Sequence, residues 1–194
     1  MSASAGGRGG SGELSRRAFT LVELIVVVAI ISVVSALAVP RLSRGATQAA
    51  RAATQADWNL LQQQIDLFAE EHLGTFPASV TDGSNAARSE AAFVAHLTRR
   101  TNMNGEVGTT AGHAYGPYLR GGIPALKLGK FAGSNGVYVY AGAAAPSPDG
   151  NRAVGWIYNA QSGAVVPNVP SETIQIVDKG VISFSGNVDA VETP

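Results

Sequence analysis

The sequence contains no cysteine among its 194 residues, which excludes disulfide bonds and metal sites with cysteine ligands. Charged residues are also scarce: they make up 14% of the chain, and the formal net charge is zero. Residues 1–18 hold three arginines and one glutamate, a net charge of +2, so the remainder carries −2. A remainder of that sign argues against general binding to nucleic acid, because phosphate backbones are bound by basic surfaces.

Sequence strings that mark common catalytic sites are absent, among them G-x-S-x-G, H-E-x-x-H and the Walker A string. The three histidines, His72, His96 and His113, do not have the spacing typical of a metal site. His72 and His96 fall on apolar faces of expected helices, where a packed or capping histidine is the commoner role. We therefore expect neither an enzyme nor metal ligands, although catalytic groups can also be assembled from distant positions.

The chain does contain one long apolar run, over residues 19–39. Of these 21 residues 17 are apolar, and the exceptions are Thr20, Glu23, Ser32 and Ser35. A helix of this length spans about 30 Å, which is the thickness of the hydrocarbon core of a membrane. A carboxylate inside such a helix costs a few kcal/mol, so Glu23 indicates a functional position with a partner. The alternative is a glutamate that reaches to the membrane interface from near a helix end.

Residues 1–18 are polar, basic and rich in glycine and serine, as a cytoplasmic leader would be. Basic residues also follow the apolar run closely, so their distribution does not settle its orientation. A short tail stays in the cytoplasm more easily than a domain of more than 120 residues, which favours a single span with the larger part on the far side. Ala36 and Ala38 leave open a secretory cleavage site, although the run is longer than that of an ordinary signal peptide.

Pro40 is expected to kink or locally melt the helix, or else to end the membrane segment. Residues 41–74 again have a helical pattern, and Gly74 supplies a stop signal. Five residues share one apolar face: Trp58, Leu61, Ile65, Phe68 and His72. The pattern predicts one helix from Phe19 to Leu73, of which 19–40 is a transmembrane half and 41–74 an amphipathic half. A membrane anchor followed by a separate soluble helix is the alternative.

Residues 75–194 are expected to form a globular α+β head. Residues 89–101 predict a short helix that Ser89 caps. After this helix the apolar pattern changes to a period of two, which is typical of strands. The expected strands are residues 137–140, a hairpin of 155–158 with 164–166, and a second hairpin of 173–177 with 181–184. The predicted fold is a long N-terminal helix packed on a small antiparallel sheet.

The string RRAFTLVEL over residues 16–24 resembles the class III leader of type IV pilins and type II secretion pseudopilins. Three features carry the resemblance: basic residues at Arg16 and Arg17, the FTLVEL string that begins at Phe19, and Pro40 near the end of the apolar block. The usual residue before the cleavage point in this family is glycine, and Ala18 stands there in this chain.

The resemblance implies that prepilin peptidase cuts between Ala18 and Phe19 and that the new amine of Phe19 is methylated. It implies that Glu23 faces the Phe19 amine of an adjacent subunit and fixes the register of a helically packed filament. The implied partners are further copies of the chain, other pseudopilins, and an inner-membrane assembly platform with a cytoplasmic ATPase. The implied location is the inner membrane with the head in the periplasm. The alternatives are a minor pilin for adhesion or DNA uptake, and an anchored periplasmic binding or enzymatic domain.

Two further stretches, residues 116–119 and 155–168, resemble the G-type branch, the major subunits of the type II secretion pseudopilus. Residues 171–194 have no counterpart in that branch. G-type proteins have a calcium site in a loop near the C-terminus, and Asp149 and Asn151 offer two oxygen side chains. The same Pro-Asp-Gly-Asn string is also a plain turn, which is our preferred interpretation, so we predict no cofactor and leave calcium as the alternative.

Overall fold

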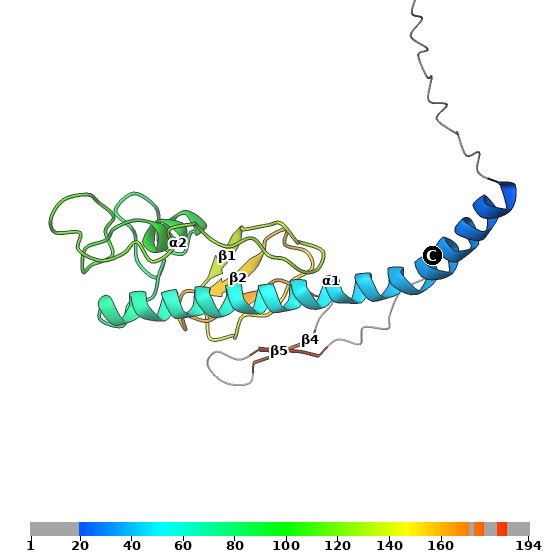
Figure 1. Ribbon diagram of the computed structural model, residues 1–194. Coiled ribbons are helices and arrows are strands. Elements are labelled where there is room, and N and C mark those ends of the chain that lie inside the picture. The colour runs from blue at the N-terminus through cyan, green and yellow to red at the C-terminus, as the bar shows by residue number, and fades with distance from the viewer. Residues whose placement is uncertain (1–19, 171–172, 177–181, 186–194) are drawn as a thin grey trace, which may run out of the picture. The chain divides into compact units, whose positions relative to one another are not determined.

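The computed structural model describes residues 20–170, 173–176 and 182–185, with the side chains of 36–44 and of 173–176 and 182–185 left out. The chain divides into two compact units, Met1–Arg44 and Gly45–Pro194, and each is described by itself. The first helix, α1 (Leu21–Glu71), has 51 residues and contributes to both units. Figure 1 shows the second unit as the later part of α1 with a short helix and a small sheet beside it.

Helix α1 is continuous through Pro40, so the secondary structure shows neither local melting nor a helix end at that residue. The alternative of a membrane anchor followed by a separate soluble helix is therefore wrong, whereas the end of the membrane segment at Pro40 stays a prediction. The helix is four residues shorter than the predicted range of Phe19 to Leu73. A kink at Pro40 would concern how the two units are oriented, and it stays a prediction.

In the second unit, the predicted apolar face of α1 forms the core of the head. Its five residues are each at most 3% exposed: Trp58, Leu61, Ile65, Phe68 and His72. The Trp58 indole donates to the carbonyl oxygen of Val165 at 2.5 Å, and the amide of Val165 donates to Gln62 Oε1 at 3.2 Å. Two side chains of α1 thus cover the outer edge of a strand that would otherwise expose unpaired backbone groups.

The second helix, α2 (Glu90–Thr98), begins as predicted. Ser89 is its N-cap, and its hydroxyl oxygen accepts a hydrogen bond from the Ala92 amide at 3.1 Å. The helix ends three residues before the predicted limit of residue 101. The carbonyl oxygen of Leu97 accepts hydrogen bonds from the amides of Tyr118 and Leu119, so this later segment binds a carbonyl of the last turn.

The head has a three-stranded sheet in the order β1 (Val137–Tyr140), β2 (Trp156–Asn159), β3 (Val165–Pro167). Strand β2 pairs antiparallel with β3, which confirms the first predicted hairpin, but β1 pairs parallel with β2. The prediction of an antiparallel sheet is therefore wrong for this pair, and the sheet is mixed. The physical reason is the connection over 141–155, which is long enough for the crossover that parallel strands need.

A separate two-stranded sheet follows, formed by β4 (Thr173–Ile176) and β5 (Ile182–Ser185). The two strands pair antiparallel, with Thr173 opposite Ser185 and Ile176 opposite Ile182. This pairing confirms the second predicted hairpin over its described residues. Residues 177 and 181, which the prediction also assigned to strands, lie outside them.

The two helical histidines are packed inside the head, as their positions predicted. The ring of His72 stacks on Phe68 with centroids 3.8 Å apart, and its two nitrogens contact the Phe68 carbonyl at 2.7 Å and the Thr101 hydroxyl at 3.0 Å. His96 is fully buried, and its Nδ1 accepts a hydrogen bond from the Ala78 amide at 2.8 Å. That bond requires an unprotonated Nδ1, because two N–H groups cannot bond to each other.

We expect the head to lose stability in acid because of His96. Burial lowers the pKa of its imidazole, and the raising effects of the Gly105 backbone and the Asp82 carboxylate do not outweigh it. In the unfolded chain the pKa is near 6.5, so below about pH 6.5 the unfolded state binds the extra proton more strongly. The free energy of unfolding should therefore be constant above this pH and fall as the pH decreases toward the lower pKa of the folded state.

Urea unfolding of the full chain in detergent, followed by tryptophan fluorescence between pH 5 and 8, measures this dependence. In His96→Gln the slope between pH 6.5 and 5 should become shallower, even though the variant is less stable throughout. An unchanged slope in the variant would assign the acid sensitivity to another group.

Candidate functional site

The start of α1 is closed by a reciprocal pair of side chains, Thr20 and Glu23. The Glu23 carboxylate accepts hydrogen bonds from the Thr20 amide at 2.9 Å and from the Thr20 hydroxyl at 3.0 Å. In return, the Glu23 amide donates to the Thr20 hydroxyl oxygen at 3.2 Å. This is a capping box, which satisfies amides that a helix start leaves without intrahelical partners. The carboxylate that the sequence singled out therefore has a partner within its own chain.

Sequence reasoning recognised Glu23 and missed the role of Thr20. The signal was present, because a threonine followed three residues later by a glutamate at the head of an apolar run is the pattern of a capping box. Glu23 is conspicuous because it is the charged residue of an apolar run, whereas a threonine at the start of such a run is not. Phe19 and Ala18, the other residues predicted to act here, lie outside the described residues, so their geometry stays a prediction.

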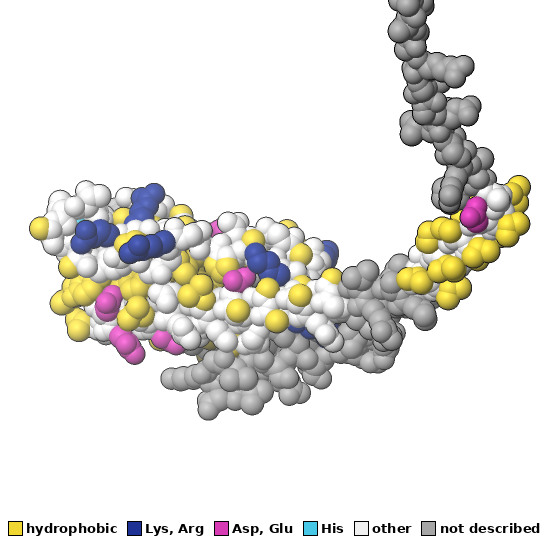
Figure 2. All heavy atoms as spheres, viewed as in Figure 1, with side chains coloured by type: hydrophobic (Ala, Val, Ile, Leu, Met, Phe, Trp, Pro, Cys, Tyr) yellow, Lys and Arg dark blue, Asp and Glu magenta, His cyan; other side chains and the backbone are white. Residues whose placement is uncertain are grey.

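Apolar side chains cover the helix behind this cap on all sides. Eleven large ones between Leu21 and Val34 are each between 47% and 73% exposed: Leu21, Val22, Leu24, Ile25, Val26, Val27, Val28, Ile30, Ile31, Val33 and Val34. Figure 2 shows them as a nearly unbroken apolar surface on the described start of the helix. A helix that is apolar all round is normally buried, either in a larger core or in a membrane. This surface therefore needs a covering, which the described residues of the chain do not supply.

Among the residues that the structure describes, no helix is both long and apolar enough to cross a membrane. The predicted span of 19–40 lies only partly within them, because Phe19 and the side chains of 36–40 are outside.

The loop that carries Asp149 and Asn151 is organised as a turn. One oxygen of the Asp149 carboxylate accepts a hydrogen bond from the Asn151 amide at 2.9 Å, and the other contacts Arg152 Nε at 3.0 Å. The Arg152 guanidinium also lies 3.5 Å from the centre of the Tyr138 ring. Because both oxygens of Asp149 are engaged in local contacts, the structure supports the interpretation of this string as a turn.

Asn168 holds this loop against the sheet. Its side chain is fully buried, and its amide nitrogen donates to three carbonyl oxygens of the loop, those of Asp149, Arg152 and Val154, at 2.9–3.1 Å. Its oxygen accepts a hydrogen bond from the Asp149 amide at 2.7 Å. The asparagine that follows β3 is therefore a structural residue, which satisfies backbone groups that the crossover would otherwise bury without partners.

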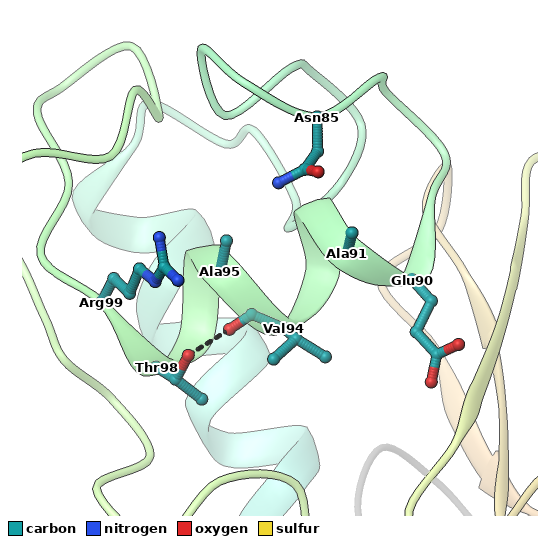
Figure 3. A pocket seen from close by; sticks show the side chains of 7 residues that line it. All are labelled: Asn85, Glu90, Ala91, Val94, Ala95, Thr98 and Arg99. Atoms are coloured by element: carbon teal, nitrogen blue, oxygen red, sulfur yellow. Dashed lines mark hydrogen bonds between the residues drawn. The ribbon is translucent and has the colours of Figure 1, made fainter.

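The surface of the head has several shallow hollows, and none of them brings together a set of catalytic groups within the described part of the chain. The one beside α2 has a volume of about 530 Å³ and is lined by Ala91, Val94 and Arg99, with Asn85 above it (Figure 3). Its acidic residue, Glu90, accepts a hydrogen bond from the Val137 amide at 2.9 Å and so connects α2 to β1. Over the same residues, no three His, Asp or Glu side chains lie close enough together to hold a metal ion.

Residues 14–39 match the family model of the prokaryotic N-terminal methylation motif. The match includes the capping box and the apolar surface described above, and it ends one residue before Pro40. This motif is the class signal of type IV pilins and pseudopilins, and it implies processing by prepilin peptidase and anchoring in the inner membrane before assembly. A comparison with curated proteins and one with solved structures found no match to this chain.

Proposed function

We propose that this chain, whose residues 14–39 match the prokaryotic N-terminal methylation motif, is a type II secretion pseudopilin of the G-type. In this role it is a structural subunit, not an enzyme, and it assembles with further copies into a helical filament. The observation that carries the proposal is the start of α1, which exposes apolar side chains on all sides. At its N-terminal end, the Glu23 carboxylate is hydrogen-bonded to Thr20. A helix of this kind suits a lipid environment first and the core of a protein filament later.

Cleavage between Ala18 and Phe19 would free an ammonium group one residue before the Thr20 cap. This ammonium group carries a positive charge that a carboxylate of a neighbouring subunit can pair with. The Thr20 groups are neutral donors, whereas an ammonium group adds direct charge–charge attraction to its hydrogen bond, so the Glu23 carboxylate favours such a partner in a medium of low dielectric constant. The registry function therefore consists of an exchange of partners, from Thr20 within the chain to Phe19 of the next subunit.

The capping box also keeps the carboxylate satisfied before assembly. An isolated buried charge is costly, whereas a hydrogen-bonded one is tolerated. The Thr20 amide and hydroxyl supply that compensation in the separate subunit. The subunit can then wait in the inner membrane with its head in the periplasm until the assembly platform and its ATPase add it to a filament.

The G-type assignment rests on the head and not on the matched motif. It is supported by the resemblance of 155–168 to that branch and by the role of Asn168 in holding the loop before β2. A minor pilin for adhesion or DNA uptake shares the same start and differs in what its head binds. Loss of secretion with normal surface pili in a deletion strain would favour the secretion role over the pilus role.

N-terminal sequencing and intact mass of the protein extracted from its native membrane test the proposal directly. We expect a mature chain that lacks residues 1–18 and begins with N-methylated Phe19. A chain that retains its first 18 residues, or one that begins after Val39, would contradict the filament role. Such a result would favour an anchored periplasmic binding or enzymatic domain.

A further inference from the structure

The C-terminal end of α1 has an unusual residue in its capping position. The amide of Gly74 donates to the carbonyl oxygen of Ala69 at 2.8 Å, the long-range bond of a Schellman motif. The left-handed residue of this motif is normally glycine, but here Leu73 occupies it with φ of 55°. The sequence predicted that the helix stops at Gly74. In the structure, the left-handed backbone conformation already begins one residue earlier, at Leu73.

Leu73 is also the most exposed large apolar residue of the described chain, at 82%. Next to it, the last turn of α1 contains no basic residue, although the carbonyl groups at a helix end favour positive charge. Glu71 accepts a hydrogen bond from the Tyr118 hydroxyl, whereas Glu70 has no hydrogen bond or ion pair among the described residues. An exposed, strained leucine beside an unpaired carboxylate contradicts local preferences, and such conflicts are expected at functional sites. We call Leu73 and Glu70 the leucine knob.

A second feature of the head has the complementary chemistry. Beyond the end of α2, an open hollow of about 610 Å³ is lined by apolar groups of Val107 and Pro117 and by Arg99 and Arg100. Both arginine side chains are exposed and make no ion pair within the part of the chain that the structure describes. We call this feature the arginine hollow; Thr98, Gly108 and Thr109 complete its lining.

The knob and the hollow belong to the same unit and carry opposite charges. Figure 2 shows a cluster of Lys and Arg side chains on the part of the head that is drawn at the left, and several Asp and Glu side chains on the lower edge of the same part. The knob, at the C-terminal end of α1, combines an exposed apolar side chain with a carboxylate, and the hollow, beyond the end of α2, combines an apolar lining with two guanidinium groups. Carboxylate and guanidinium groups pair with favourable geometry.

We propose that the leucine knob of one copy docks into the arginine hollow of the next copy in the filament. Leu73 enters the hollow over Val107 and Pro117, and the Glu70 carboxylate pairs with Arg99 or Arg100. The contact uses two different surfaces of the same chain, so it is heterologous, and in a helical filament such a contact repeats from copy to copy without closing. The inference rests on the proposed function, because it requires that the copies assemble side by side.

The variant Leu73→Gly separates this contact from folding. Glycine is the preferred residue at this left-handed position, so the variant should be processed normally and unfold at an equal or higher urea concentration. We nevertheless expect its filament yield to fall at least tenfold in the secretion host, measured by shearing and electron microscopy. The matched control is Leu73→Met, which keeps an apolar side chain and should retain most of the yield. Wild-type yield from Leu73→Gly would overturn the proposal.

Charge exchange tests the pairing. Glu70→Arg should lower filament yield at least tenfold, and so should the variant that combines Arg99→Glu with Arg100→Glu. When all three substitutions are combined, at least half of the larger of these two losses should be recovered, measured on a logarithmic scale. Separate losses without recovery would overturn the pairing. Normal assembly of Arg99→Glu with Arg100→Glu, together with loss of DNA binding by the filaments, would also overturn it and assign the hollow to nucleic acid.

Because the chain has no cysteine, a disulfide can report the contact without background. Filaments assembled from the unmodified chain together with a variant that carries both Leu73→Cys and Thr109→Cys should give a ladder of covalent dimers and longer species after mild oxidation, and either single variant in the same mixture should remain monomeric. Filaments without a ladder would overturn the contact and leave the proposed function intact. Absence of any filament from the unmodified chain would instead contradict the proposed function, and the docking contact with it.

Discussion

Filament assembly is expected to stop when Glu23 is replaced by alanine, while the subunit remains in the inner membrane and its head remains folded. The substitution removes the carboxylate that would pair with the Phe19 ammonium of a neighbour, and it also removes one half of the capping box with Thr20. The capping contribution is typically about 1 kcal/mol. Loss of the cap alone should therefore fray the first turn of α1 without detaching an anchor of more than ten exposed large apolar residues.

Two further variants separate the charge from the cap. Glu23→Gln keeps an acceptor for the Thr20 groups but has no charge, and Thr20→Val keeps the charge but removes the hydroxyl partner. If the charge is the essential feature, Glu23→Gln fails to assemble and Thr20→Val assembles at a reduced yield. Filament yield, membrane fractionation and the extent of processing should be measured together for all three variants. Equal filament yield from Glu23→Gln and the parent would remove the registry role.

The largest loss of stability is expected for Trp156→Ala in the head. Trp156 is fully buried on β2, and its indole nitrogen donates to the carbonyl oxygen of Pro124 at 2.7 Å. Replacing a buried tryptophan by alanine typically costs about 3–5 kcal/mol, which is a large share of the 5–15 kcal/mol that stabilises a typical domain. We expect the variant chain to be degraded in cells and to unfold in detergent at a much lower urea concentration.

The matched control is Trp156→Phe, which keeps an aromatic ring in the core and removes the donor to Pro124. It should cost less than half as much as the alanine variant, because most of the buried apolar surface is retained. The free energies of unfolding come from urea titrations followed by circular dichroism, since Trp58 alone remains as a fluorescent tryptophan in both variants. Equal losses in the two variants would mean that the hydrogen bond, and not the packing, dominates at this site.

The parts of the fold that the sequence predicted well are those set by local patterns. The apolar face from Trp58 to His72 repeats with the period of a helix, and the structure buries all of it. Ser89 has the chemistry of an N-cap, and it caps α2. Each strand that the sequence pattern predicted is present at least in part, although β2 and β3 are buried at every residue instead of at every second one.

The parts that the sequence could not predict depend on residues that are distant along the chain. The parallel pairing of β1 with β2 is determined by the path of the crossover between them, which no strand pattern encodes. The same holds for Asn168, whose four side-chain hydrogen bonds all reach residues at least 14 positions away. At the candidate site, the T-x-x-E pattern was readable, but the geometry of the predicted cleavage point is not among the described residues.

The reciprocal cap at the start of α1 also bears on whether growth of the polymer can be reversed. Thr20 donates two hydrogen bonds to the Glu23 carboxylate of its own chain. A subunit that leaves the proposed filament therefore does not expose an unpaired charge to lipid. For the Glu23 carboxylate, departure from the proposed filament then costs only the difference between two hydrogen-bonded states. We expect the proposed filament to shorten readily by returning subunits to the membrane, so that the same subunits can be assembled again.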